Sequence, residues 1–279
     1  MNKNKQYTIK WLSDLHLNFY NKQEREELYR KIKNGRFDSL IITGDIATSD
    51  TFYVYLEEMS RHITNKYVYF ILGNHDYYSG NIFDCEMAAD DFTMFCAGNF
   101  MYMPHCSRIA LNEEIGLCLV GVNGWADARN GAAENTHIRL NDSIYINDLV
   151  EAEKQDRLFT EMRKWADRDA TTLRNQLYNL PLWCTQVIVA THVPPFIETC
   201  LYQGKQSDKN FLPFFSSKVL GDTILEFAEK FPHIQITSIS GHTHGGGEAR
   251  IRENVLAKTH NSEYNKMKSK LLRFKGISC

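Results

Sequence analysis

Long apolar runs are missing from this sequence of 279 residues. Nowhere does it contain the roughly 18 consecutive apolar residues that a membrane-spanning helix needs. Residues 1–14 include lysines but no apolar stretch of the length found in secretory signal peptides. These absences predict a soluble protein, located in the cytoplasm, with no membrane partner.

The sequence also lacks a strong excess of charge. Lysine and arginine number 32 and aspartate and glutamate 34, so the formal net charge is only −2. A protein without a net positive charge has no general electrostatic attraction for nucleic acid or for an anionic membrane. Nucleic acid is therefore not an expected partner, and any recognition of phosphate has to come from a local site.

Paired cysteine motifs are absent as well. The seven cysteines are an odd number and are scattered without CxxC spacing, which predicts neither a disulfide framework nor a zinc ribbon. No internal repeat, low-complexity tract or linker divides the chain, and hydrophobic residues make up an ordinary globular 43%. We therefore expect one domain over residues 1–279, built around a sizeable core.

Short apolar runs are what the sequence does contain, and they predict strands. Because these runs are continuous rather than alternating, we expect strands that are covered on both faces. Helical patterns separate the first three runs, and this β-α-β-α-β order predicts an α/β fold with a parallel sheet. The predicted strands are 7–12, 39–43, 67–72, 185–190 and 234–239, and the helices between the first three are 21–33 and 50–63.

Further elements are predicted with less regular patterns. Residues 107–112 and 117–123 are joined by a short turn, which indicates a hairpin and thus some antiparallel pairing. Residues 147–179 predict one long helix, broken at most once, with Leu158, Met162 and Trp165 on its apolar face. Another helix is expected at 216–230, and the alternation in 249–258 predicts edge strands.

Polar side chains follow each of the five predicted strands. In open α/β sheets the loops at the carboxyl ends of the strands converge on the ligand site, so these side chains are expected to meet. Each motif alone is weak, since a lone histidine after a strand is more often a structural residue than a ligand. Their order along the chain is Asp14 and His16, then Asp45, then Asn74, His75 and Asp76, then His192, then His242 and His244.

Taken in order, these motifs resemble those of the calcineurin-like metallophosphoesterase superfamily. The series DxH at 14–16, GD at 44–45, GNHD at 73–76, His192 and GHxH at 241–244 covers most of the chain. The resemblance implies a four-layer α/β/β/α sandwich of two mixed sheets flanked by helices. It also implies a dinuclear metal centre between the edges of the two sheets, and it accounts for the predicted hairpin.

The resemblance implies roles for individual residues in that centre. One divalent ion would be bound by Asp14, His16 and His244, the other by Asn74, His192 and His242, and Asp45 would bridge the two. Carboxylate, imidazole and amide groups together form a ligand set suited to Mn²⁺, Fe²⁺ or Zn²⁺ rather than Ca²⁺. A bridging carboxylate is physically sensible because its two oxygens and its charge serve two cations held about 3.5–4 Å apart.

The implied reaction is the hydrolysis of a phosphoester. In such a centre a hydroxide that bridges the metals attacks phosphorus, and His75 would protonate the leaving oxygen as general acid. Some family members carry GDxxD, whose last aspartate orients the catalytic histidine, whereas this sequence offers Thr48 at that position. Asp76 is the adjacent candidate for orienting His75 in catalysis, with capping of the following turn as its alternative role.

Glycines precede the predicted ligands. Gly44, Gly73 and Gly241 each stand directly before a ligand or a pair of ligands, where their small size allows tight turns and close packing. An extended backbone at 242–244 is expected to hold both imidazole rings near the shared centre.

The polar, glycine-containing segment 123–149 is the expected determinant of substrate choice. Loops of this length often cover active sites. Arg129 and Arg139 could contact a phosphate and Trp125 could stack on a base or sugar, which makes these three the candidate substrate-binding residues. The alternative is a surface insertion that packs its tryptophan against the long helix.

Three functions remain open at this stage. The first is a phosphodiesterase or phosphomonoesterase acting on a small phosphorylated molecule. The second is a nuclease, which the near-neutral charge disfavours. The third is a non-catalytic scaffold with this fold that binds a protein partner, which a complete ligand set disfavours because crowded acids and histidines are costly without metal.

Overall fold

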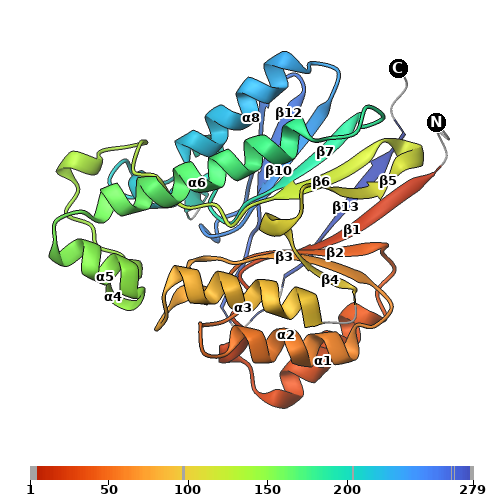
Figure 1. Ribbon diagram of the computed structural model, residues 1–279, viewed down its shortest axis with the longest axis horizontal. Coiled ribbons are helices and arrows are strands. Elements are labelled where there is room, and N and C mark those ends of the chain that lie inside the picture. Colours follow the sequence, from red (N-terminus) through yellow and green to blue (C-terminus); the bar gives the residue numbers. More distant parts are fainter. Residues whose placement is uncertain (1–4, 96–97, 203, 265, 267, 277–279) are drawn as a thin grey trace.

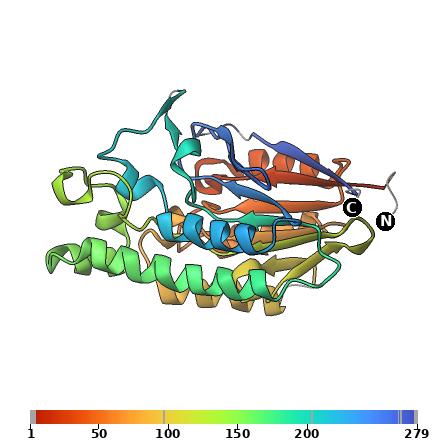
Figure 2. The same cartoon turned by 90° about the horizontal axis from the view of Figure 1, so that it is seen from above.

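Two β-sheets lie face to face, and helices cover the outer side of each (Figure 1). The structure is a computed structural model that describes residues 5–95, 98–202, 204–264, 266 and 268–276. The layers run helix, sheet, sheet, helix (Figure 1), and the view from above shows the helices Leu158–Tyr178 and Lys218–Lys230 lying over the strands (Figure 2). The predicted α/β/β/α sandwich of two mixed sheets is therefore confirmed.

The first sheet has five strands in the order β13-β1-β2-β3-β4. β1 to β4 are parallel, and β13 is antiparallel to β1 at one edge. Three helices cover the outer face of this sheet (Figure 1). The bounds are β1 Gln6–Leu12, β2 Ser39–Thr43, β3 Tyr67–Ile71, β4 Phe100–Tyr102, β13 Lys270–Lys275, α1 Lys22–Lys33, α2 Phe52–His62 and α3 Ile82–Phe95.

The second sheet has six strands in the order β11-β12-β10-β7-β6-β5. Its four inner strands are parallel, and β5 and β11 pair antiparallel at the two edges. Helices α6 and α8 cover its outer face (Figure 1). The bounds are β5 Ile109–Asn112, β6 Leu117–Gly121, β7 Gln186–Ala190, β10 Gln235–Ser240, β11 Gly247–Arg252, β12 Val255–Thr259, α6 Leu158–Tyr178 and α8 Lys218–Lys230.

Alternate side chains of each strand enter different parts of the core, as the two-residue period of a strand requires. In β1, Ile9 and Trp11 are fully buried between the two sheets, whereas Leu12 packs with the helices of the first layer. β2 and β7 are buried at every position. Burial on both faces explains why the predicted strands are continuous apolar runs.

The long helical pattern at 147–179 forms two helices with one break, as expected. α5 spans Asn147–Lys154, and α6 begins at Leu158 after a turn in which Asp156 has a φ of 55°. Leu158 and Met162 are buried on α6, and Trp165 is partly buried beside them. The hairpin of β5 and β6 and the helix predicted at 216–230 are also present.

Part of the sequence interpretation is wrong. Residues 249–258 were expected to form edge strands, but only β11 is an edge, and β12 lies inside the sheet, parallel to β10. Its alternation reflects burial on one face at Val255, Ala257 and Thr259. α3, β4 and β13 were not predicted, because β4 has three residues and the KLLRFK of β13 mixes charge with its apolar positions.

The remaining elements are short. They are the α-helices α4 Asp142–Tyr145 and α7 Leu212–Phe215, the strands β8 Leu201–Tyr202 and β9 Lys205–Gln206, and the 3-10 helices Leu17–Phe19, Asn74–Tyr77, Met103–His105, Glu113–Ile115, Ala133–Asn135 and Ile197–Thr199. β8 and β9 form a small arm that projects from the molecule (Figure 2). Within the described part of the chain, no helix combines the length and the apolar character needed to cross a membrane.

Candidate metal centre

The structure brings all seven predicted metal ligands together. Asp14 and His16 follow β1, Asp45 follows β2 and Asn74 follows β3, so the first sheet supplies four of them. His192 follows β7, and His242 and His244 follow β10, so the second sheet supplies the other three. Parallel strands present their carboxyl ends at one edge, which is why residues up to 230 positions apart in the chain can meet there.

One group of ligand atoms comes from four of these residues. The ligand atoms of Asp14, His16, Asp45 and His244 all lie within 4.8 Å of one another. Nε2 of His244 is 3.4 Å from Oδ1 of Asp14, and Nε2 of His16 is 3.8 Å from Oδ2 of Asp45. This is the set expected for one metal, together with the expected bridge.

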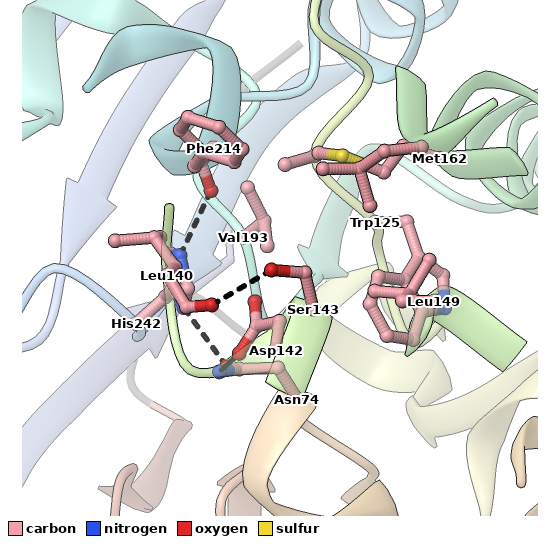
Figure 3. Close-up of a pocket in the computed structure, with 12 residues that line it drawn as sticks. Asn74, Trp125, Leu140, Asp142, Ser143, Leu149, Met162, Val193, Phe214 and His242 are labelled. Atoms are coloured by element: carbon pink, nitrogen blue, oxygen red, sulfur yellow. Dashed lines mark hydrogen bonds between the residues drawn. The ribbon is translucent and has the colours of Figure 1, made fainter. Parts of the chain in front are cut away.

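A second group surrounds the amide oxygen of Asn74. Oδ1 of Asn74 is 2.9 Å from Nε2 of His192 and 3.0 Å from Nδ1 of His242, the latter visible in Figure 3. Nε2 of His192 is also 3.3 Å from Oδ1 of Asp45. Asp45 therefore directs one oxygen toward each group, the position that a bridging carboxylate requires.

When both imidazole rings are neutral, the second group sets acceptor against acceptor, which is the arrangement a cation would occupy. Carbonyl oxygens only accept, so Nδ1 of His192 donates to Thr43 O at 2.8 Å and Nε2 of His242 donates to Phe214 O at 3.0 Å. In a neutral ring the other nitrogen then carries a lone pair, and in both rings it faces Asn74. The amide nitrogen of Asn74 donates to Asp142, which fixes Oδ1 toward the histidines. Metal-bound histidines typically donate their second N–H in this way.

His16 gives an independent sign of a missing partner. Its side chain is 1% exposed, and neither ring nitrogen has a hydrogen-bond partner among the described residues. Burial lowers the pKa of His16 to about 4, so the ring is neutral at pH 7 and can offer a lone pair. An unpaired buried polar group is costly, and a metal ion at Nε2 would remove that cost.

The carboxylates supply negative charge for cations. Burial opposes their ionisation, but the hydrogen bond and charge of His244 hold the pKa of Asp14 well below its usual range. Asp45 is also buried, which opposes its ionisation, but the charge that His192 carries when protonated lowers its pKa. Both groups are therefore ionised at neutral pH, so the residues present fit a centre for two divalent ions.

The backbone at the centre is held in an unusual conformation. Five of the seven predicted ligands have a left-handed φ: Asp14 at 53°, His16 at 44°, Asp45 at 52°, His242 at 70° and His244 at 58°. The expectation of an extended backbone at 242–244 is therefore wrong. Left-handed residues turn the chain sharply, and such strain concentrates at functional sites where the surroundings enforce it.

Two features enforce this conformation. The loops after β1 and β2 are joined by backbone hydrogen bonds from Asp14 to Gly44 and from His16 to Asp45, of 3.0 and 2.9 Å. Glycines provide the room: a Cβ at Gly73 would lie 2.3 Å from Oδ1 of Asp45, and one at Gly241 would lie 1.9 Å from Oγ of Ser13. The predicted use of small residues before the ligands is consistent with both distances.

His75 lies beside the two groups, with its ring between two others. It stacks on Tyr78 with ring centroids 4.3 Å apart and meets the ring of His16 edge-on at 4.6 Å. Its backbone N–H donates to Oδ1 of Asp45 at 2.9 Å. The ring is partly exposed to the hollow described below, as a proton donor to a substrate must be.

The carboxylate of Asp76 is hydrogen-bonded to the backbone. The carboxylate is fully buried and accepts hydrogen bonds of 2.8 Å from the backbone N–H groups of Ala47 and Gly73. Burial raises the pKa of Asp76 to about 7. No hydrogen bond joins its carboxylate to the His75 ring among the described interactions. Geometry thus favours the alternative role, in which Asp76 caps the turn, over the catalytic one.

A hollow of about 270 Å³ opens over the centre. Several predicted site residues line it, among them Asp45, Asn74, His75, His242 and His244. Its other walls come from residues that were not predicted as site residues: Tyr78, Leu140, Asn141, Asp142, Tyr202, Phe215, Thr243 and Tyr264. The segment 123–149 therefore reaches the hollow, but through residues 140–142.

The three candidate substrate-binding residues do not line this hollow. Trp125 is 4% exposed, and its ring is tilted against that of Tyr77. It lines an adjoining cavity of about 20 Å³ with Met162 of α6 (Figure 3). The residues that line both this cavity and the hollow are Asn74, Leu140, Asp142 and His242. Arg129 pairs with Asp127 and Asp167, and Arg139 pairs with Glu153. For Trp125 the geometry supports the alternative of packing against the long helix, because a buried ring cannot stack on a substrate.

Sequence reasoning missed several residues around the centre. Ser262 donates to Oδ2 of Asp14 at 2.9 Å and is bonded to the buried His260, so both steady a predicted ligand. The ring of Tyr264 lies 4.8 Å from that of His16 and 5.0 Å from that of His244. These residues follow β12 without any recognisable motif, so only the fold reveals them.

Comparisons with known proteins agree with this geometry. A dimetal phosphatase from Danio rerio has a similar structure, with a TM-score of 0.57 and 12% identity over 97% of this chain and 99% of that one. GAP50, the anchor in the inner membrane complex of Plasmodium, has a TM-score of 0.52 and 12% identity over 96% and 81%. No curated protein matches the sequence. The family model for calcineurin-like phosphoesterases matches residues 7–246, and the chain belongs to that family.

Proposed function

We propose that this protein is a dimetal-dependent phosphoester hydrolase that acts on a small phosphorylated molecule, as a phosphomonoesterase or a phosphodiesterase. One observation carries the proposal: Nε2 of His192 and Nδ1 of His242 converge on the amide oxygen of Asn74, beside the buried carboxylate of Asp45. Family membership and the likeness to a protein described as a dimetal phosphatase support it.

Two divalent ions would be held by the two groups of side chains. Asp14, His16 and His244 would hold one, Asn74, His192 and His242 the other, and Asp45 would be shared. Mn²⁺, Fe²⁺ and Zn²⁺ suit such a mixed ligand set. When bound, the ions would activate a shared water as the nucleophile and neutralise charge on the phosphoryl oxygens.

His75 would give a proton to the leaving oxygen. Its ring is confined between Tyr78 and His16, and its backbone is tied to Asp45, so it is held at the rim of the hollow in one orientation. A positioned general acid contributes typically about 10²–10⁴-fold to such a step.

The shape and charge of the protein favour a small substrate. The hollow over the centre measures about 270 Å³ and is walled by aromatic and polar side chains. The formal net charge of −2 supplies no general attraction for a long polyanion, so a nuclease remains the weaker alternative. The described cysteines are free thiols, which is compatible with the expected cytoplasmic location; cell fractionation would test it.

The proposal is tested by metal analysis and hydrolysis assays on the full chain. We expect two equivalents of a divalent metal in the purified protein, and hydrolysis of p-nitrophenyl phosphate or bis-p-nitrophenyl phosphate in the presence of Mn²⁺. The relative rates on the two compounds divide a monoesterase from a diesterase. Asp45→Asn should lose metal from both positions and most activity, because its carboxylate serves both groups.

The outcome also decides between enzyme and scaffold. A folded protein that takes up no Mn²⁺, Fe²⁺ or Zn²⁺ and hydrolyses neither compound would overturn the hydrolase proposal. Such a result would favour a scaffold that binds a protein partner, as the anchor role named for GAP50 illustrates for another protein of this fold. The seven converging ligand residues argue for the enzyme, since a scaffold has no use for them.

A further inference from the structure

A second hollow adjoins the one over the metal centre. It measures about 480 Å³ and is lined by Tyr202, Lys205, Gln206, Ser207, Asp208, Phe211 and Phe215. Tyr202 and Phe215 also line the first hollow, so the two spaces share a wall. A substrate whose phosphate sits at the metal centre would extend into this second space.

Aromatic rings run from the metal centre into the second hollow. The ring of Phe215 meets that of the predicted ligand His242 edge-on, with centroids 5.4 Å apart. It also stacks with the ring of Phe211, with centroids 5.6 Å apart and an interplanar angle of 30°. Tyr202 stands on the projecting arm of β8 and β9 and is 60% exposed (Figure 2). The space therefore offers π-faces to a flat ligand.

A polar group in this hollow lacks a partner. Ser207 is 6% exposed, and its Oγ makes no hydrogen bond within the part of the chain that the structure describes. Lys205 and Asp208 bring one charge of each sign, so the hollow favours neither a second phosphate nor a cation. An unsatisfied buried hydroxyl and an aromatic wall together suit a ring that has both a π-face and a hydrogen-bonding edge.

We propose that the second hollow binds a flat nitrogen heterocycle carried on the alcohol side of the phosphoester, as in a nucleotide. This inference rests on the proposed function, because the hydrolase reaction places the phosphate at the centre. The heterocycle stacks against Tyr202 and Phe211, and its polar edge takes the hydroxyl of Ser207. The released product is then the nucleoside, and the aromatic hollow selects the leaving group.

Paired substrates test the proposal. Purine and pyrimidine nucleoside 5′-monophosphates are each compared with ribose 5-phosphate, which has the same reacting ester and no base. If only diesters are cleaved, the methyl esters of both are used. Stacking of a base on an aromatic side chain is worth roughly 5- to 150-fold in binding. We expect kcat/KM to favour at least one nucleotide over ribose 5-phosphate by a factor in that range.

Variants of the aromatic residues test whether the second hollow causes the preference for nucleotides. Tyr202→Ala and Phe211→Leu should each reduce the nucleotide to ribose 5-phosphate ratio of kcat/KM toward 1. Tyr67→Ala is the matched control, because Tyr67 is 55% exposed and begins β3, at the end of the strand away from the centre. Its ratio should equal that of the wild type. Equal kcat/KM for all nucleotides and ribose 5-phosphate in the wild type would overturn the proposal.

A binding measurement separates this inference from the proposed function. Saturation-transfer NMR with nucleosides and with ribose, on the full chain, needs no catalysis. We expect saturation at the base protons, lost in Tyr202→Ala and kept in Tyr67→Ala. Base binding without hydrolysis of any phosphoester would support the heterocycle site in the second hollow and overturn the proposed hydrolase function. Hydrolysis of a phosphoester with no saturation at any base proton would support the proposed hydrolase function and overturn the heterocycle site in the second hollow.

Discussion

The carboxylate of Asp142 lies 2.8 Å from the amide nitrogen of Asn74, a predicted metal ligand (Figure 3). The same Oδ1 accepts a hydrogen bond of 2.8 Å from the hydroxyl of Tyr78, whose ring stacks on His75. One residue thus positions both a ligand and the ring beside the proposed general acid. It comes from the segment 123–149, which was expected to act through its arginines and tryptophan.

Removing this carboxylate should weaken one metal position. In Asp142→Ala, the Asn74 amide loses the partner that turns its oxygen toward the histidines. Loss of groups that orient ligands typically reduces metal affinity about 10- to 100-fold. Asp142→Asn keeps an acceptor oxygen and should lose less. Titration calorimetry with Mn²⁺ would measure both affinities. Asp156→Asn, which changes an exposed aspartate, is the control. If Asp142→Ala bound the second Mn²⁺ as tightly as the wild type does, the proposed role of Asp142 would be wrong.

The two histidines of the GHTH segment should belong to different metals. His242 faces Asn74, whereas His244 faces Asp14. Glycine is the fitting substitute at both positions, because it accepts a left-handed φ and offers no ligand atom. His242→Gly and His244→Gly should each bind one equivalent of metal in place of two, measured by elemental analysis after dialysis.

The identity of the retained site provides the control for this pair. Combining His242→Gly with Asn74→Ala should remove no further equivalent of metal, since both changes affect the same metal position. Combining His244→Gly with Asn74→Ala should remove the second equivalent as well. If either single variant loses both metals while remaining folded by circular dichroism, the division of the ligands between two ions is wrong.

The elements that carry ligands were predictable from sequence because they are buried on both faces. β2 and β7 are buried at every position, so both are continuous apolar runs. β2 is followed directly by Gly44-Asp45, and β7 ends shortly before His192. The order of such motifs then indicated the family. By contrast, every second residue of β13 is exposed and only one is buried, so its sequence mixes charged and apolar residues and predicts nothing distinctive.

The surroundings of the metal centre could not be predicted in the same way. Asp142, Ser262 and Tyr264 reach it from loops and a four-residue helix, where no periodicity constrains the sequence. Arg129 and Arg139 suited phosphate by residue type, but their charges are already matched by neighbouring carboxylates. Residue type shows what a side chain could bind, and only the fold shows what it contacts.

Loss of His75 should affect substrates according to their leaving groups. An alkoxide needs a proton when it leaves, whereas p-nitrophenolate does not. His75→Ala should therefore lower kcat by about 10²–10⁴-fold on an alkyl phosphoester and by much less on the p-nitrophenyl ester, with metal content unchanged. Equal losses on both substrates, or loss of metal, would rule out the role of general acid.

Asp169 on α6 should make folding stability depend on pH. It is 4% exposed and accepts a hydrogen bond of 2.8 Å from the backbone of Gly124, next to Asn123, whose carbonyl accepts the N–H of His192. Burial raises the pKa of Asp169 to about 6, even though Arg168 lowers it. Because the folded protein holds this proton more tightly than the unfolded chain, the contribution is fully present below about pH 4 and is lost as pH rises through 6.

The size and sign of this effect can be measured with one variant. A shift of about two pKa units corresponds to roughly 2–3 kcal/mol. The free energy of unfolding of Asp169→Asn, relative to the wild type, should therefore rise by about that amount between pH 4 and pH 7, in urea titrations with chelator present. Asp167→Asn, an exposed aspartate on the same helix, is the control and should follow the wild type. Parallel stability curves for Asp169→Asn and the wild type would show that Asp169 does not titrate in this range, and that the loop holding His192 is insensitive to its charge.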